Sequence, residues 1–115
     1  ADVLSTFEAG AELAPGVRSM AAYGHTPGHT LFTVHSGNEK FAYVADITNV
    51  PQLFARNPDW AVQFDMDADA ARESRRKVFD MVVRDNMVTG GYHFPFPAFG
   101  KVEKLGAGFD FKPVA

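Results

Sequence analysis

One long amphipathic helix is expected among segments that otherwise have the composition of β-strands, and this contrast limits the folds open to the chain. The helical pattern runs from about residue 69 to residue 85, with Asp67 and Asp69 as suitable N-cap residues. Its apolar stripe consists of Val78, Phe79, Val82 and Val83. A strand-rich order with one such helix predicts an α/β fold in which a sheet is covered by helices.

The helix also carries a group of cationic residues, namely Arg72, Arg75, Arg76 and Lys77. They lie largely on the side opposite the apolar stripe, so we expect a solvated face. A basic binding patch is the alternative, but the net charge of −3 offers no wider basic surface to extend it.

The remaining segments read as strands, with turn signals between them. The predicted strands are 17–23, 30–36, 41–46, 87–92 and a closing hairpin formed by 101–106 and 109–114. The segment 30–36 alternates in polarity, whereas 41–46 (FAYVAD) is nearly all apolar, as expected for a strand buried on both faces. A short helix is expected within 50–57.

Composition narrows the class of protein. A chain of 115 residues is long enough for one domain, and 46% hydrophobic residues indicate a packed core. The acidic balance argues against a nucleic-acid partner. No apolar run approaches the roughly 20 residues that span a bilayer, which argues against a membrane partner. Because the chain has no cysteine, any metal must be bound by nitrogen and oxygen ligands.

The segment YGHTPGHTLF, residues 23–32, holds two of the four histidines on a predicted loop. Gly24, Pro27 and Gly28 make a helix here unfavourable.

Three potential ligands fall at comparable positions: His25 follows a strand, Asp46 ends one, and His93 follows another. Two imidazoles and a carboxylate suit zinc or a similar divalent metal. The alternative is that the histidines are structural and that Asp46 caps a turn.

The motif GHTPGHT, the strand that ends in VAD and a strand–His followed by a Phe/Pro loop resemble the metallo-β-lactamase superfamily. The stretches AVQFDMDADAARESRRKVF and GFDFKPV strengthen the likeness, which is greatest to methyl parathion hydrolases and related dinuclear-metal lactonases. The resemblance implies that His25 binds one metal, that Asp46 bridges two metals as the catalytic carboxylate, and that His93 completes the second site. It implies that His29 holds the loop by packing and hydrogen bonding. We expect His35 to lie at the surface.

The superfamily's main His-x-His-x-Asp-His loop has no counterpart in this sequence. The resemblance therefore implies that residues 1–115 form a single unit, the C-terminal half of an αββα sandwich, without the N-terminal half. Three of seven expected ligands would be present, so we expect the isolated chain to have little turnover.

In the complete enzyme, the resemblance implies two divalent metal ions, in the first place zinc, and a bridging hydroxide that attacks a small-molecule ester, lactone or phosphotriester. Phe96 and Phe99, in the loop after His93, are the candidates for a substrate pocket.

An unpaired half would expose apolar side chains on one sheet face. We therefore expect association with the missing half or self-association through that face. Two alternatives remain: a non-catalytic half-domain that acts as a partner-binding module, and a small β-rich binding module without metal.

Overall fold

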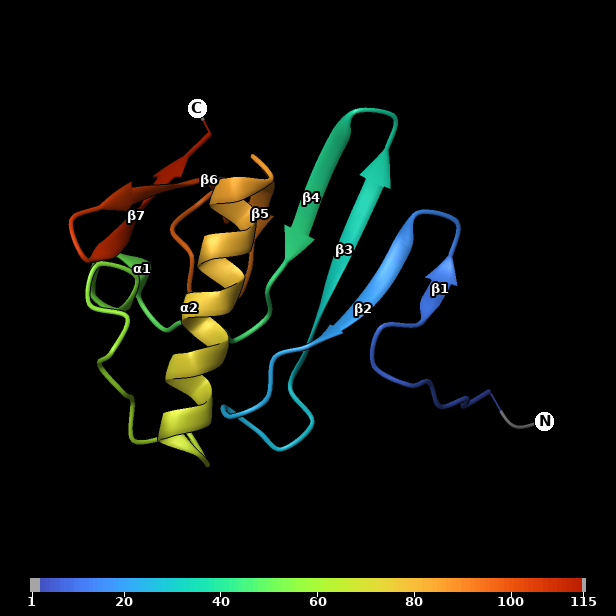
Figure 1. Cartoon of the computed structure of the whole chain (residues 1–115), viewed down its shortest axis with the longest axis horizontal. Helices are drawn as coiled ribbons and strands as arrows, with labels where there is room; N and C mark the ends of the chain where they lie inside the picture. Colours follow the sequence, from blue (N-terminus) through green and yellow to red (C-terminus); the bar gives the residue numbers. More distant parts are fainter. Residues whose placement is uncertain (1–2, 115) are drawn as a thin grey trace.

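The computed structural model describes residues 3 to 114, and over this range the strands form one mixed sheet in chain order (Figure 1). The strands are β1 Glu12–Ala14, β2 Val17–Ala21, β3 Thr30–Ser36, β4 Glu39–Tyr43, β5 Val88–Gly90, β6 Phe99–Leu105 and β7 Gly108–Pro113. The helices are α1 Pro51–Phe54 and α2 Ala68–Arg84. The predicted α/β class is confirmed, as are the long helix, the short helix and the closing hairpin.

Every pair of neighbouring strands is antiparallel except β4 and β5, which are parallel. A parallel pair needs a long crossover connection. Here the crossover contains both helices, and it brings β5 alongside β4 so that the ends of the two strands meet at one edge.

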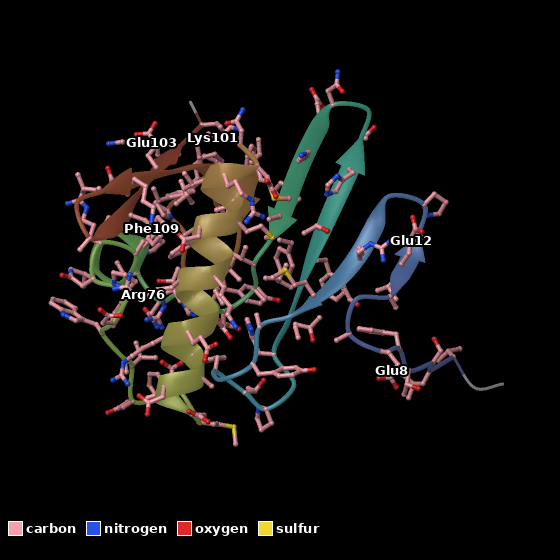
Figure 2. The ribbon with its side chains drawn as sticks, viewed as in Figure 1. Glu8, Glu12, Arg76, Lys101, Glu103 and Phe109 are labelled. Atoms are coloured by element: carbon pink, nitrogen blue, oxygen red, sulfur yellow. The ribbon has the colours of Figure 1, made fainter. Side chains whose placement is uncertain are left out.

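Figure 1 shows α2 in front of β5, and the apolar stripe of the helix belongs to the buried core that it forms with the sheet. It begins at Asp67, whose side chain accepts a hydrogen bond from the Ala70 backbone N–H at 3.0 Å. Val78, Phe79 and Val82 are buried, and the Phe79 ring lies 5.3 Å from the ring of Phe109. Phe109 is labelled in Figure 2. This contact places the core between α2 and the helix-facing side of the sheet.

The prediction that all four cationic residues of α2 are solvated is wrong for Arg75, which is buried. The segment between α1 and α2 folds over this position and supplies backbone carbonyls to the guanidinium. Arg76, by contrast, is half-exposed and pairs with Asp59 in the same segment (Figure 2).

The prediction that 41–46 is a strand buried on both faces is also wrong. β4 ends at Tyr43, and only Ala42 and Val44 are fully buried, because the helix covers one face of the sheet. The other side, here called the open face, carries Phe32, Val34, Phe41, Tyr43, Val88 and Phe99. Val34, Phe41, Val88 and Phe99 line a hollow of ≈ 740 Å³ on it.

Within residues 3 to 114, neither helix is long and apolar enough to cross a membrane.

Candidate metal centre

A small hollow lies where the segments after β2, β4 and β5 meet. Its lining consists of His25, Asp46, Thr48, Asn49, Val62, Asp65, Arg75 and His93. The three predicted ligands, which are far apart in the sequence, therefore line one space. Its volume of ≈ 10 Å³ is about that needed for a single water molecule.

His93 and Asp46 are in direct hydrogen-bond contact at the hollow, with His93 Nε2 3.0 Å from Asp46 Oδ1. Two backbone hydrogen bonds hold their loops together: Val44 N–H donates to the Gly90 carbonyl and Tyr92 N–H to the Ala45 carbonyl. Ala45 (φ 47°) and His93 (φ 65°) both adopt left-handed backbone conformations. Such conformations cost free energy and concentrate at functional sites, so they indicate that these two loops belong to such a site.

His25 is held by the segment that leads into α2. The Met66 N–H donates to the His25 carbonyl, and the Asp67 N–H donates to the Gly24 carbonyl. Gly24 has φ +132°, and a Cβ there would lie 2.1 Å from the backbone nitrogen of Ala71, so only glycine fits this approach. The sequence shows the glycine but not the close contact with the backbone of α2 that requires it.

Asp65 and Arg75 are members of the site that sequence reasoning missed. Asp65 Oδ1 lies 3.0 Å from His25 Nδ1, and both the Asp65 and Arg75 side chains are only 2% exposed. In the sequence Asp65 is one of several aspartates before the helix, and Arg75 is one of four neighbouring cationic residues. No local pattern distinguishes either of them.

His29 is buried beside the ligand candidates and uses both ring nitrogens. The Asp46 backbone N–H donates to His29 Nε2 at 3.0 Å, so Nδ1 carries the proton and donates to the Ala22 carbonyl at 2.8 Å. The ring therefore ties the backbone of Asp46 to the end of β2. His35, on β3, is exposed as expected.

The two phenylalanines predicted for a substrate pocket lie elsewhere. Phe96 is 95% exposed, and Phe99 belongs to the open face. Neither lines the hollow that holds His25, Asp46 and His93, so their role in substrate binding stays a prediction.

Tyr43 lies at the end of β4, with its ring 5.8 Å from that of Tyr92. Burial raises the pKa of Tyr43 to about 12, and Tyr92 and the charge of Asp46 act in the same direction. This phenol is therefore protonated at neutral pH.

The chemistry of the lining suits a divalent metal, since His25, Asp46 and His93 offer imidazole nitrogen and carboxylate oxygen. Thr48 adds a buried hydroxyl that has no hydrogen-bond partner among the described residues, as expected where a polar occupant belongs. However, between residues 3 and 114 no three such donors converge closely enough to hold an ion. The residues present fit part of a metal site, and further ligands are needed.

Several solved structures share this fold. AidC, described as a dizinc quorum-quenching lactonase and solved with a product bound, is 32% identical and superposes with a TM-score of 0.89. AidC matches 95% of this chain, and the hydrolase AbOPH of the β-lactamase superfamily matches 89% at 24% identity and a TM-score of 0.83. The chain has the fold of a metallo-β-lactamase half-domain. A probable metal-dependent hydrolase from Staphylococcus aureus shares this fold at 20% identity and a TM-score of 0.72.

The half-domain spans only 37% of AidC, 35% of AbOPH and 40% of the S. aureus protein. No protein-family model and no curated protein matches the sequence.

Proposed function

We propose that this half-domain is part of a metal-dependent hydrolase that acts on an ester, a lactone or a phosphotriester. The observation that carries the proposal is the convergence of His25, Asp46 and His93 on one hollow, from three separate loops. The likeness to AidC, a dizinc lactonase, supports the same class of reaction.

In this proposal His25, Asp46 and His93 hold two divalent ions together with ligands from outside the described residues. When bound, such ions supply an activated hydroxide and polarise the carbonyl or phosphoryl group of the substrate. The chain's own residues keep the ligands in place. His29 fixes the backbone of Asp46, and the hydrogen bond from the Tyr92 N–H to the Ala45 carbonyl holds the loops of Asp46 and His93 together beside the hollow.

The missing ligands require a partner, and we propose that the open face binds it. Several apolar side chains of this face are partly exposed, including Val34 at 36% and Phe99 at 42%. Apolar patches of this kind generally mark an interface. The lengths of the neighbouring structures favour the rest of a longer protein as the partner, with a second copy of this chain as the alternative.

The test is the metal content and the mass of the assembled protein, either the longer protein that contains this half-domain or a dimer of the chain, both measured by native mass spectrometry. We expect bound zinc or a similar ion in the wild type and its loss in His25→Ala, because one ligand is removed. His35→Ala is the matched control, since His35 lies exposed on β3 away from the hollow.

Equal, non-zero metal content in the assembled wild type and the assembled His25→Ala variant would contradict the role of His25. A chain that associates but never binds metal, even with its partner present, would favour the non-catalytic half-domain that binds a partner.

A further inference from the structure

We propose that Asp65 is a positioning residue: its carboxylate, held by Arg75, fixes His25 in the tautomer that leaves Nε2 free to bind a metal. The inference rests on the proposed function, in which His25 is a ligand. The carboxylate comes from the segment before α2, outside the three ligand loops, so it adds a fourth element to the site.

The Asp65 carboxylate meets one hydrogen-bond donor and one cation at the same oxygen. The Val62 N–H donates to Oδ2 at 3.4 Å, and an Nη of Arg75 lies 3.7 Å from the same oxygen. Oδ1 remains for His25 Nδ1, at 3.0 Å.

Arg75 is itself fixed, because it donates to the backbone carbonyls of Ile47, Pro58 and Trp60 at 2.9, 2.7 and 2.7 Å. These bonds anchor the guanidinium to the segments that follow β4 and α1. A buried guanidinium with this many fixed partners is a rigid support for a carboxylate. The backbone carbonyls therefore hold Arg75, Arg75 lies against Asp65, and Asp65 contacts His25.

The contact with Asp65 decides which imidazole nitrogen carries the proton. An ionised carboxylate only accepts hydrogen bonds, so His25 Nδ1 must donate and Nε2 keeps its lone pair. Metal-binding histidines commonly donate their second nitrogen to a carboxylate, which orients the ring and strengthens the ligand. Asp65 and His25 have this relationship, and the His25 side chain is 26% exposed, so the ring is not sealed off.

Asp65→Asn is the sharpest test, because the structure predicts which way the amide will turn. The Val62 N–H and Arg75 both face the Oδ2 position and both require an acceptor, so the amide oxygen will occupy it. The NH₂ group then faces His25 Nδ1 and donates to it. His25 must switch to the tautomer with the proton on Nε2, which closes that nitrogen to a metal.

The measurement is a long-range ¹H–¹⁵N spectrum of the imidazole rings without metal, at a pH of about 8 where an ordinary imidazole is neutral. The His25→Gln variant identifies the His25 signals. We expect protonated Nδ1 in the wild type and protonated Nε2 in Asp65→Asn. Wild-type His25 with its proton on Nε2, or an Asp65→Asn variant that keeps it on Nδ1, would overturn the proposal.

Asp67→Asn is the matched control. Asp67 caps α2 two residues away, and asparagine caps a helix as well as aspartate does, so the wild-type tautomer should remain. A Zn²⁺ titration of the same signals then tests the ligand role separately. If the His25 signals shift on addition of Zn²⁺, we expect Asp65→Asn to weaken Zn²⁺ binding by about 10- to 100-fold. If the tautomers behave as expected but Zn²⁺ leaves His25 of the assembled wild-type protein unchanged, the proposed function fails and the positioning by Asp65 holds.

Discussion

Arg75→Met tests the interpretation that one buried cation supports the whole site. Methionine keeps much of the volume of the arginine stem and removes the guanidinium. In the structure that group donates three hydrogen bonds to backbone carbonyls and lies beside the carboxylate of Asp65, with only 2% of its side chain exposed. Burial lowers the pKa of Arg75, and the charge of Asp65 opposes that shift. An arginine nevertheless stays charged in a protein.

The expected loss of stability follows from the buried groups that lose their partner in Arg75→Met. Three carbonyls lose a charged donor, and Asp65 keeps a buried negative charge that no longer faces Arg75. Removing one partner of a buried pair costs about 3–5 kcal/mol. Total stabilities are about 5–15 kcal/mol, so this change removes a large fraction of the free energy of unfolding.

Urea unfolding followed by circular dichroism measures this cost. With a slope of about 1–2 kcal/mol/M, the midpoint should fall by about 1.5 M or more. Arg72→Met is the control on the same helix. Arg72 pairs with Asp69, which is 96% exposed, and donates to the Asp59 carbonyl at 2.7 Å; exposed contacts of this kind contribute about 1 kcal/mol each or less. An Arg75→Met midpoint no lower than that of Arg72→Met would refute the reasoning.

Two further predictions concern the loop of His25 and the last strand. Gly24→Ala should destabilise the chain by about 2 kcal/mol or more, because the new Cβ meets the Ala71 backbone and φ is positive. Thermal unfolding measures this effect. Gly28→Ala is the control, since a Cβ there meets nothing within 4 Å. Equal melting temperatures for the two variants would contradict the close approach. Lys112, and then Arg56, lower the pKa of the Asp110 carboxyl in the folded state. The ionised Asp110 therefore stabilises the fold at any pH above the unfolded pKa of about 3.9. This stabilisation is lost as the pH falls through the lower folded pKa. Urea midpoints of wild type and Asp110→Asn should therefore differ at neutral pH and converge in acid, and a gap that is independent of pH would argue against this.

Local pattern was sufficient for the elements themselves. The stripe Val78, Phe79 and Val82 repeats at helical spacing, and Asp67 supplies a cap, so α2 was predictable to within a residue or two. The alternation in 30–36 likewise matches β3. These features depend on neighbours within a few residues, which the sequence displays directly.

The ligand candidates His25, Asp46 and His93 were identified from a family resemblance and from their positions after strands, and the structure places them around one hollow. The extent of burial was harder to predict. A nearly continuous apolar run suggested a strand covered on both faces, yet Phe41 and Tyr43 lie on the open face. An apolar side chain looks the same in sequence whether it meets a helix of the same chain or a surface that awaits a partner.

Asp65 and Arg75 belong to what only the tertiary structure decided. Each is one charged residue among several similar neighbours, and no spacing separates the buried pair from the solvated ones. Arg75 is buried because the segment after α1 folds over it and offers two carbonyls, with a third from Ile47 after β4, and Asp65 reaches His25 from that same segment after α1. The sequence determined which residues form the helix and strands, since those depend on local periodicity. The fold decided which charges meet, because that depends on contacts between residues 40 positions apart.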